Sequence, residues 1–333
     1  MTRVIAVTGG KGGVGKTNIS LNLALVLAKL GIKVCLFDAD LGLANINILL
    51  GLYPEYDLED VILNNKSVNE ILIRNYQGID IIPGSSGVEK LANLGQDDID
   101  RIVEAFSKLD VYDYFILDTS AGISRSVISF CLAASDVALV ITPEPTSLTD
   151  AYALLKVLCF NGFRGSPKVI VNQCKNTTVA STAYNKLKEV VQKYLTLDIV
   201  PLGIIIRDKK FPEAVQRQQP LVSLYPQSGA AKCLNVIASR LLANQSESFR
   251  QTGLATFWAR FLEITKTPLK LPEKTDVQQK EIGAVEPEET VCAPQPEEDI
   301  ALELQDIQPP QPAAPADRQN PQPAAPASHE PPA

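Results

Sequence analysis

Short apolar runs alternate with helical patterns over the first 245 residues of the chain. The runs predict strands at 3–8, 33–38, 79–83, 114–118, 137–142, 168–172 and 199–205, and the helical patterns fall at about 17–30, 97–108, 125–134, 147–160, 178–195 and 228–243. The runs 34–37 and 138–141 are apolar at every position, as is typical of parallel strands covered on both faces. The pattern therefore predicts an α/β fold with a doubly wound, mostly parallel sheet.

The composition changes sharply near Pro272. Residues 273–333 hold 13 acidic against three basic side chains, a net charge of −10, so the preceding residues carry +3 of the total of −7. Repeated Pro-Ala and Pro-Gln steps fill this segment, which cannot bury enough apolar surface to offset the entropy of ordering. We expect one α/β domain at 1–245, an amphipathic extension at 246–272 and a disordered acidic tail at 273–333.

A glycine-rich loop between the first strand and the first helix carries the strongest chemical signal. It matches the phosphate-binding pattern Gly-x-x-x-x-Gly-Lys-Thr, with candidate nucleotide-binding residues Gly10, Lys11, Gly12, Gly13, Val14, Gly15, Lys16, Thr17 and Asn18. Backbone N–H groups of such a loop wrap a polyanion, and the following helix N-terminus adds a favourable dipole. Lys16 can reach the β- and γ-phosphates, and the Thr17 hydroxyl can coordinate Mg²⁺. A glycine-rich turn without a ligand is the weaker alternative.

A second lysine, Lys11, lies inside this loop, although a plain phosphate-binding loop does not require one. A cation there could reach the phosphates of a nucleotide bound in a facing subunit and stabilise the charge on the γ-phosphoryl oxygens. The alternative is a solvated surface lysine.

Carboxylates end two of the predicted strands. Asp118 follows 114–117 at the position of a Walker B aspartate, where it can orient Mg²⁺ directly or through a water, or else cap the strand end. The stretch Phe37-Asp38-Ala39-Asp40 ends another strand beside the loop, and we expect its two carboxylates to have different tasks. Asn172 ends another strand with an amide suited to a base edge, or to capping the next loop.

The loop Lys11-Gly12-Gly13-Val14-Gly15-Lys16-Thr17 resembles the signature of the MinD/ParA family of deviant phosphate-loop ATPases. The resemblance implies an ATP-bound homodimer in which Lys11 acts in trans, with ATP or ADP and Mg²⁺ as ligands and slow turnover that a partner stimulates. It assigns Lys11, Lys16 and Asp40 to catalysis, with Asp40 positioning the attacking water. It further assigns Asp38 to the switch I region beside the metal, 118–122 to switch II, Asn172 to adenine, and Arg207 and Asp208 to the second wall of the base site. For Arg207 and Asp208, a capping role in the loop is an equal alternative.

Finer matches resemble the FlhG (FleN) members of this family, which limit flagellar number and position. They are the stretches 15–18, 38–45, 118–124 and 224–226. The resemblance implies partners such as an FlhF-like GTPase, flagellar switch proteins or a flagellar transcription activator. Two features depart from that pattern: the acidic tail, and a first strand that is not preceded by the extension through which FlhG proteins stimulate FlhF.

Residues 249–270 carry a net charge of +3 and one bulky apolar helical face. The face consists of Leu254, Phe257, Trp258, Phe261 and Leu262. Such a helix suits an anionic membrane surface, and MinD-like proteins end in a membrane-targeting helix of this kind. We expect reversible peripheral association with the inner face of the cell membrane, with docking of the helix on its own domain as the alternative.

Other classes of function find less support in the sequence. The single histidine, His329, lies in the tail, so catalysis and metal binding by histidine are excluded, and neither a signal peptide nor a membrane-spanning run is expected in this cytoplasmic protein. Cys131 has no evident second cysteine with which to hold an iron–sulfur cluster. The net charge of +3 on residues 1–272 is too small to indicate a DNA-binding surface. A cell-division or cargo-positioning ATPase of the same family, or an adaptor that binds nucleotide without hydrolysis, remain the alternatives.

Overall fold

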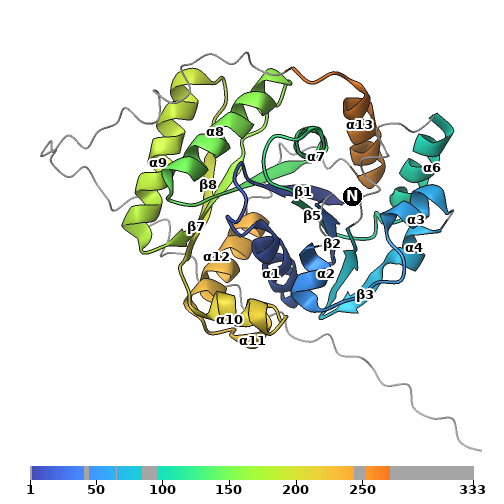
Figure 1. Ribbon diagram of the computed structural model, residues 1–333, viewed down its shortest axis with the longest axis horizontal. Helices are drawn as coiled ribbons and strands as arrows, with labels where there is room; N and C mark the ends of the chain where they lie inside the picture. The colour runs from blue at the N-terminus through green and yellow to red at the C-terminus, as the bar shows by residue number, and fades with distance from the viewer. Residues whose placement is uncertain (1, 41–44, 65, 85–95, 244–252, 271–333) are drawn as a thin grey trace, which may run out of the picture. The chain divides into compact units, whose positions relative to one another are not determined.

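An eight-stranded sheet lies at the centre of the computed structural model, in the order β3-β4-β2-β5-β1-β6-β7-β8 (Figure 1). All neighbouring strands pair in parallel except β3, which runs antiparallel to β4 at one edge. The structure describes residues 2–40, 45–64, 66–84, 96–243 and 253–270, all of which fall within one compact unit, residues 1–289.

The elements of this unit alternate along the chain. The strands are β1 Arg3–Thr8, β2 Val34–Ala39, β3 Ile73–Tyr76, β4 Ile79–Ile82, β5 Tyr114–Thr119, β6 Asp136–Ile141, β7 Lys168–Cys174 and β8 Val200–Ile206. The described helices are α1 Lys16–Lys29, α2 Asn45–Leu50, α3 Leu58–Leu63, α4 Val68–Ile71, α6 Gln96–Ser107, α7 Arg125–Ala133, α8 Pro145–Phe160, α9 Thr177–Tyr194, α10 Lys210–Gln216, α11 Leu221–Leu224, α12 Gly229–Ala243 and α13 Leu254–Lys266.

Successive strand residues face two separate apolar cores. In β1, Val4 and Ala6 belong to the core beneath α7, α8 and α13, whereas Ile5 and Val7 belong to the core beneath α1 and α12. Helices therefore cover both faces of the sheet, which explains why its central strands are apolar at every position. The predicted fold class is confirmed.

The sequence pattern missed several short elements at the margins. It gave neither the edge strand β3 nor the helices α2, α3, α4, α10 and α11. The burial of β3 is only partial, and its sequence Ile-Arg-Asn-Tyr has no clear apolar period. Helices of four to seven residues are too short to show a helical period, so local caps define them, such as the capping box in which Asp57 bonds the first turn of α3.

The helix α13 packs against the body of the protein, contrary to the expectation that its apolar face meets a membrane. The five predicted membrane residues, Leu254, Phe257, Trp258, Phe261 and Leu262, are each at most 1% exposed. The Trp258 ring lies 4.2 Å from Phe106 of α6, and the Phe261 ring lies 4.3 Å from Phe130 of α7, centroid to centroid. Contacts with Phe106 and Phe130 therefore bury the apolar face of α13 without a membrane. The alternative of docking on the domain is the arrangement of this structure.

The tail expected at 273–333 lies outside the described residues. Among the residues that are described, no helix combines the length and the apolar character needed to cross a bilayer.

Candidate nucleotide-binding site

The glycine-rich loop joins the end of β1 to the start of α1. Gly13 and Gly15 have φ angles of 76° and 96°, which favour glycine because a side chain would be strained there. A Cβ atom on Gly10 would lie 2.2 Å from the carbonyl of Asp150 in α8, so the loop passes α8 too closely for any side chain. The loop at 9–15 therefore has the tight backbone path that lets N–H groups surround a phosphate.

Lys16 begins α1 and is only 8% exposed. Burial lowers the pKa of its ammonium group, and the negative charges of Asp118 and Asp40 act in the opposite direction. Gly15 precedes the helix without a side-chain cap, so the first N–H groups of α1 have no side-chain acceptor there. A buried cation and a helix N-terminus thus face the same loop, as polyphosphate binding requires.

Asp118 on β5 is fully buried beside the start of α1. Ser20 donates a hydrogen bond of 2.9 Å to its Oδ1 atom, while its Oδ2 atom has no hydrogen-bond partner among the described residues. Burial raises the pKa of Asp118 to about 6, and the Thr17 and Ser20 hydroxyls and Lys16 partly offset this. A buried carboxylate oxygen without a donor, next to the Thr17 hydroxyl, fits the hard oxygen ligands that Mg²⁺ prefers.

Asp38 on β2 pairs in register with Asp118 on the neighbouring strand. The Asp38 carboxylate accepts hydrogen bonds from the backbone N–H groups of Asp40, at 3.2 Å, and Ile46, at 3.0 Å. Burial, together with the negative charge of Asp118, raises the pKa of Asp38 to about 8. Asp40 lies at the rim of the site, where Asn45 donates a hydrogen bond of 2.8 Å to its carboxylate. The two carboxylates therefore do have different surroundings: Asp38 anchors the chain that leads to α2, and Asp40 faces the rim.

The raised pKa of Asp38 makes the stability of the metal-free protein depend on pH. Between about pH 4 and pH 8 the folded carboxyl holds a proton that the unfolded chain has lost, so the free energy of unfolding falls as pH rises. We expect Asp38→Asn to remove roughly 4 kcal/mol of this fall, as measured by urea unfolding in EDTA at pH 5 and pH 9.

Asp110→Asn is the matched control for this experiment. Burial opposes ionisation of Asp110, but hydrogen bonds from Thr2 and Leu254 outweigh it and leave the pKa lowered. Asp110 is therefore charged in both states over the tested range, and its removal leaves the pH dependence in place. An unchanged slope in Asp38→Asn would contradict the assignment to Asp38.

The residues that follow Asp118 contact the phosphate-binding loop directly. The N–H of Gly122 donates to the carbonyl of Gly9 at 3.1 Å, and the Thr119 hydroxyl donates to the carbonyl of Val7 at 3.0 Å. The segment 118–122 is therefore hydrogen-bonded to the loop and to the strand that precedes it, and α7 begins three residues after this segment.

Lys11 points away from Lys16 and toward the start of α8. Its Nζ atom donates to Glu144 Oε2 at 2.6 Å and to Thr146 Oγ1 at 2.8 Å. This pair lowers the pKa of the Glu144 carboxyl. The Lys11 and Glu144 side chains remain 35% and 58% exposed, so the ion pair is weak and easily exchanged for another anion.

A cavity of about 730 Å³ opens beside the loop, lined by Gly13, Gly15, Asn18 and segments of β7, β8 and α10. This volume suits a nucleoside. The cavity brings together Asn172, Arg207 and Asp208, the three residues predicted for the base site.

Asn172 and Asp208 also form hydrogen bonds with backbone groups of the protein. The Asn172 amide donates to the carbonyl of Val14 at 2.7 Å and accepts from the N–H of Gln173 at 2.8 Å, so it supports the loop. Asp208 accepts from the N–H groups of Lys210 and Ala230, at the starts of α10 and α12, while Arg207 is exposed. Adenine contacts by these three residues remain a proposal.

The sequence pattern missed other residues that line this cavity. Gln173 has a φ angle of 59°, unusual for a residue other than glycine, and its side chain donates to the carbonyl of Gly13. Ile206, Phe211 and Pro212 supply an apolar wall. A Phe-Pro pair after a strand end is the one signal that could have marked this wall in advance.

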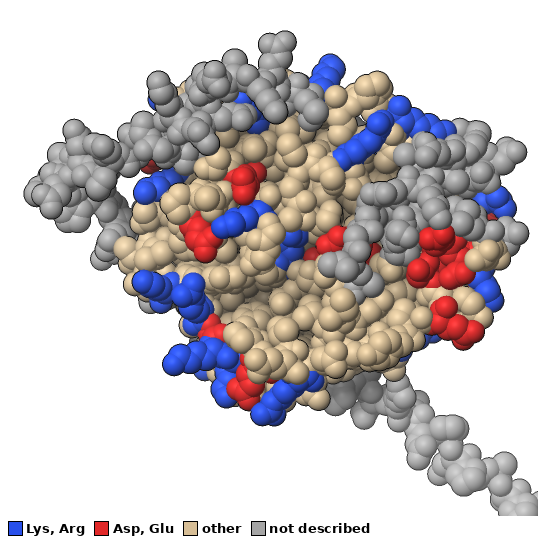
Figure 2. All heavy atoms as spheres, in the orientation of Figure 1, with Lys and Arg blue, Asp and Glu red and all other residues tan. Residues whose placement is uncertain are grey.

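Two further observations bear on the other classes of function. Cys131 is fully buried in α7, which raises the pKa of its thiol to about 12 and leaves it packed as a core residue rather than presented as a cluster ligand. Figure 2 shows basic and acidic side chains interspersed over α10, where Glu213 pairs with Lys210 and Arg217. This face has mixed charge instead of the basic stripe that nucleic acid requires.

Known proteins share both the sequence and the fold. Residues 2–161 match a family model described as an AAA domain. The chain is 41% identical over 240 residues to the antiactivator FleN of Pseudomonas aeruginosa, covering 72% of this chain and 86% of that protein. It is 32% identical over 267 residues to the flagellum site-determining protein YlxH of Helicobacter pylori, covering 79% and 90% of the two chains.

A solved structure shares the fold. The septum site-determining protein MinD complexed with Mg-ADP, from Pyrococcus horikoshii OT3, superposes with a TM-score of 0.57 at 25% identity and covers 75% of this chain and all of that one.

Proposed function

The chain belongs to the MinD/ParA family of ATPases, close to its FlhG/FleN members, and we propose that it is an ATP-dependent switch that controls the number or placement of flagella. In this proposal the protein is a monomer with ADP and a homodimer with ATP. Hydrolysis is slow, and a partner accelerates it.

The proposal rests on one observation: the two lysines of the loop differ in burial and in the groups they contact. Lys16 is buried near Asp118 and would neutralise phosphate in its own subunit, whereas Lys11 is partly exposed and bonds the exposed Glu144 carboxylate and the Thr146 hydroxyl. A nucleotide phosphate presented by a second subunit would replace Glu144 as the partner of Lys11. The new contact would be stronger than the ion pair with Glu144, because charge-assisted hydrogen bonds strengthen where water is excluded. The ATP-bound form would therefore dimerise across this loop.

The remaining site residues supply positioning rather than covalent chemistry. Thr17 and Asp118 would hold Mg²⁺, which neutralises charge on the phosphates. Asp40 orients the attacking water, Asp38 fixes the segment that begins α2, and residues 118–122 sense the γ-phosphate through their contact with Gly9. Turnover is slow because no side chain here is a strong base, so a partner must complete the site.

The partners follow from the relatives. FleN is named as an antiactivator and YlxH as a flagellum site-determining protein, which favours a flagellar transcription activator, flagellar switch proteins or an FlhF-like GTPase as partners here. We propose that the dimer, rather than the monomer, binds them.

Membrane association is the second part of the proposal, and it requires α13 to leave its groove. Arg125 begins α7, three residues after the segment 118–122, and donates a 2.6 Å hydrogen bond to the carbonyl of Thr267 at the end of α13. A movement of α7 on ATP binding would therefore loosen this contact. Two released helices on one dimer would hold an anionic membrane surface better than one, because the second binds at high effective concentration.

Liposome flotation tests this part. In ATP, we expect the protein to float with vesicles that contain about 30% anionic lipid. In ADP, the fraction of protein that floats should be roughly fivefold lower, and no protein should float with neutral vesicles. Lys16→Ala, which removes the phosphate-binding ammonium, is the control and should stay unbound under both conditions. Equal flotation in ATP and ADP, or none in either, would refute the membrane switch and leave α13 as a structural helix.

A further inference from the structure

A second cavity, of about 540 Å³, lies between α7, α13 and the segment that joins α8 to β7. Its lining includes Ala134 and Ser135, just before β6, and Asn161–Gly165, before β7. The cavity is therefore at the amino ends of β6 and β7, whereas the phosphate-binding loop is at the carboxyl ends of the parallel strands. The proposed function assigns no role to it.

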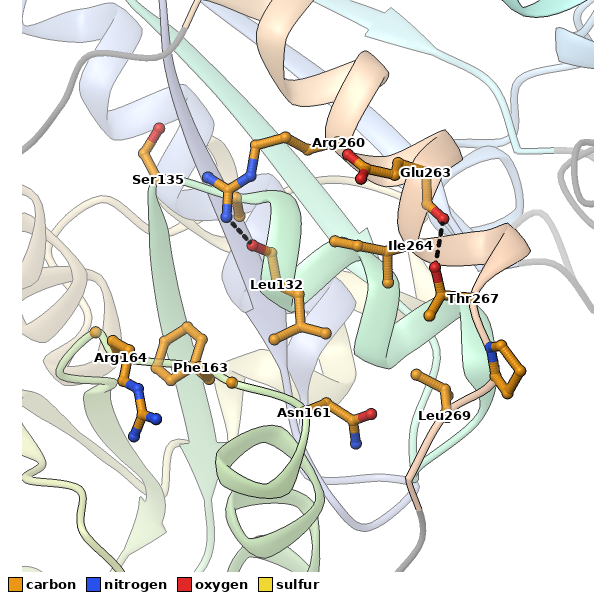
Figure 3. A pocket seen from close by; sticks show the side chains of 14 residues that line it. Leu132, Ser135, Asn161, Phe163, Arg164, Arg260, Glu263, Ile264, Thr267 and Leu269 are labelled. Carbon is orange, nitrogen blue, oxygen red and sulfur yellow. Dashed lines mark hydrogen bonds between the residues drawn. The ribbon is translucent and has the colours of Figure 1, made fainter. Parts of the chain in front are cut away.

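The cavity combines an apolar centre with two guanidinium groups. The side chains of Leu132, Ile264 and Leu269 converge on one hollow in Figure 3. Arg260 lies on one side and donates to the carbonyl of Leu132 at 3.0 Å. Arg164 lies next to Phe163 at the edge of the lining, is exposed, and forms no hydrogen bond or ion pair with another described residue (Figure 3). Among the described residues that line this cavity, Glu263 is the one acidic side chain. Such a lining suits a short peptide with carboxylates and aliphatic side chains.

The last described residue, Lys270, lies at the rim of this cavity. Asn161 holds the backbone of Lys270 on both sides, donating to its carbonyl and accepting from its N–H, each at 2.9 Å. The sequence that follows supplies the matching chemistry: residues 281–289 read Glu-Ile-Gly-Ala-Val-Glu-Pro-Glu-Glu, with four carboxylates around Ile282 and Val285. The ten intervening residues can span up to about 35 Å, so this segment reaches the cavity with length to spare.

We propose that residues 281–289 dock in the cavity of their own chain, with carboxylates on Arg164 and Arg260 and with Ile282 or Val285 against Leu132 and Ile264. The covalent link raises the effective concentration of the segment to the millimolar range, so weak contacts suffice for occupancy. The docked segment bridges α13 to α7 and to the segment after α8, and it thereby holds α13 on the body. Docking is independent of whether α13 ever meets a membrane.

Limited trypsin digestion of the full-length chain tests the docking. The bond after Lys280 borders the proposed segment, and the bond after Arg318, further along the same tail, is an internal reference. Neutralising Arg164 with Arg164→Gln should raise the cleavage rate after Lys280 roughly fivefold relative to Arg318, because the segment spends more time undocked. Raising the salt concentration to about 0.5 M should have the same effect on the unmodified protein.

Further variants separate docking from a general loss of charge or of stability. Lys186→Gln, on the exposed side of α9, makes the same charge change away from the cavity and should leave the ratio unchanged. The triple variant Glu286→Gln/Glu288→Gln/Glu289→Gln should raise it as Arg164→Gln does, and combining the two sets should add nothing further.

Three outcomes would overturn the proposal: an unchanged ratio in Arg164→Gln, an equal change in Lys186→Gln, or additive effects of the two sets. Protection that disappears when the protein is diluted would assign the segment to a second copy of the chain and overturn docking within one chain.

Discussion

Asp40→Ala is expected to form a dimer that persists in ATP and is absent in ADP, while turnover falls about a hundredfold. Asp40 sits at the rim of the site and contacts Asn45, whereas phosphate binding depends on Lys16 and on backbone N–H groups. Removing this carboxylate therefore leaves binding in place and removes the group that we assign to orienting water. The nucleotide that drives dimerisation then remains intact.

Light scattering in ATP and in ADP measures the mass, and phosphate release measures turnover. Asp40→Asn is the matched variant, because its amide oxygen still accepts the hydrogen bond from Asn45 but carries no charge. A loss of turnover in both variants assigns the effect to the charge; a loss in Asp40→Ala alone assigns it to the geometry of the segment after β2. Monomers in both nucleotides, with ATP binding demonstrated, would favour the adaptor that binds without hydrolysis.

Much of this site was predictable because its residues follow strands with clear apolar runs. Parallel strands place their carboxyl ends at one edge of the sheet, so Asp38 and Asp118 had to lie near the loop at 9–15 once the strands were recognised. The register of β2 and β5 confirms this by pairing the two aspartates directly. The fold class follows from the same runs.

The position of α13 could not be predicted in this way. An amphipathic pattern reports that one face avoids water, but it does not distinguish a membrane from a protein groove. The groove is made by Phe106 and Phe130, which are far from Trp258 in sequence. The partner of Lys11 was missed for the same reason, since Glu144 lies 133 residues away. Gln173 was missed because a positive φ angle leaves no trace in composition.

Lys11→Ala should lower turnover about a thousandfold and abolish the ATP dimer, while ATP binding to the monomer is retained. Lys16 stays in place to bind phosphate, so the change removes only the charge that we assign to the facing subunit. Glu144→Gln is the matched control, because it removes the partner of Lys11 within the subunit and leaves the lysine. If Lys11 acts in trans, Glu144→Gln keeps dimer formation and turnover. If the ion pair within the subunit is what matters, both variants lose them together.

Mixing two inactive variants gives the sharper test of action in trans. In a dimer of one Lys11→Ala subunit with one Asp40→Ala subunit, the first subunit keeps its own Asp40 and receives Lys11 from the second, so one complete site is formed. A one-to-one mixture should therefore recover between about a quarter and about a half of the wild-type turnover, because each mixed dimer has one working site of two. Random pairing would make half of the dimers mixed, and the failure of Lys11→Ala subunits to pair with each other raises that share. Phosphate release across a titration of one variant against the other measures this recovery. If each subunit used its own Lys11, no mixture could assemble a complete site, and turnover would stay at the level of the separate variants. Recovery would thus place the nucleotide between the subunits, with Lys11 of one facing the phosphates held by Lys16 of the other.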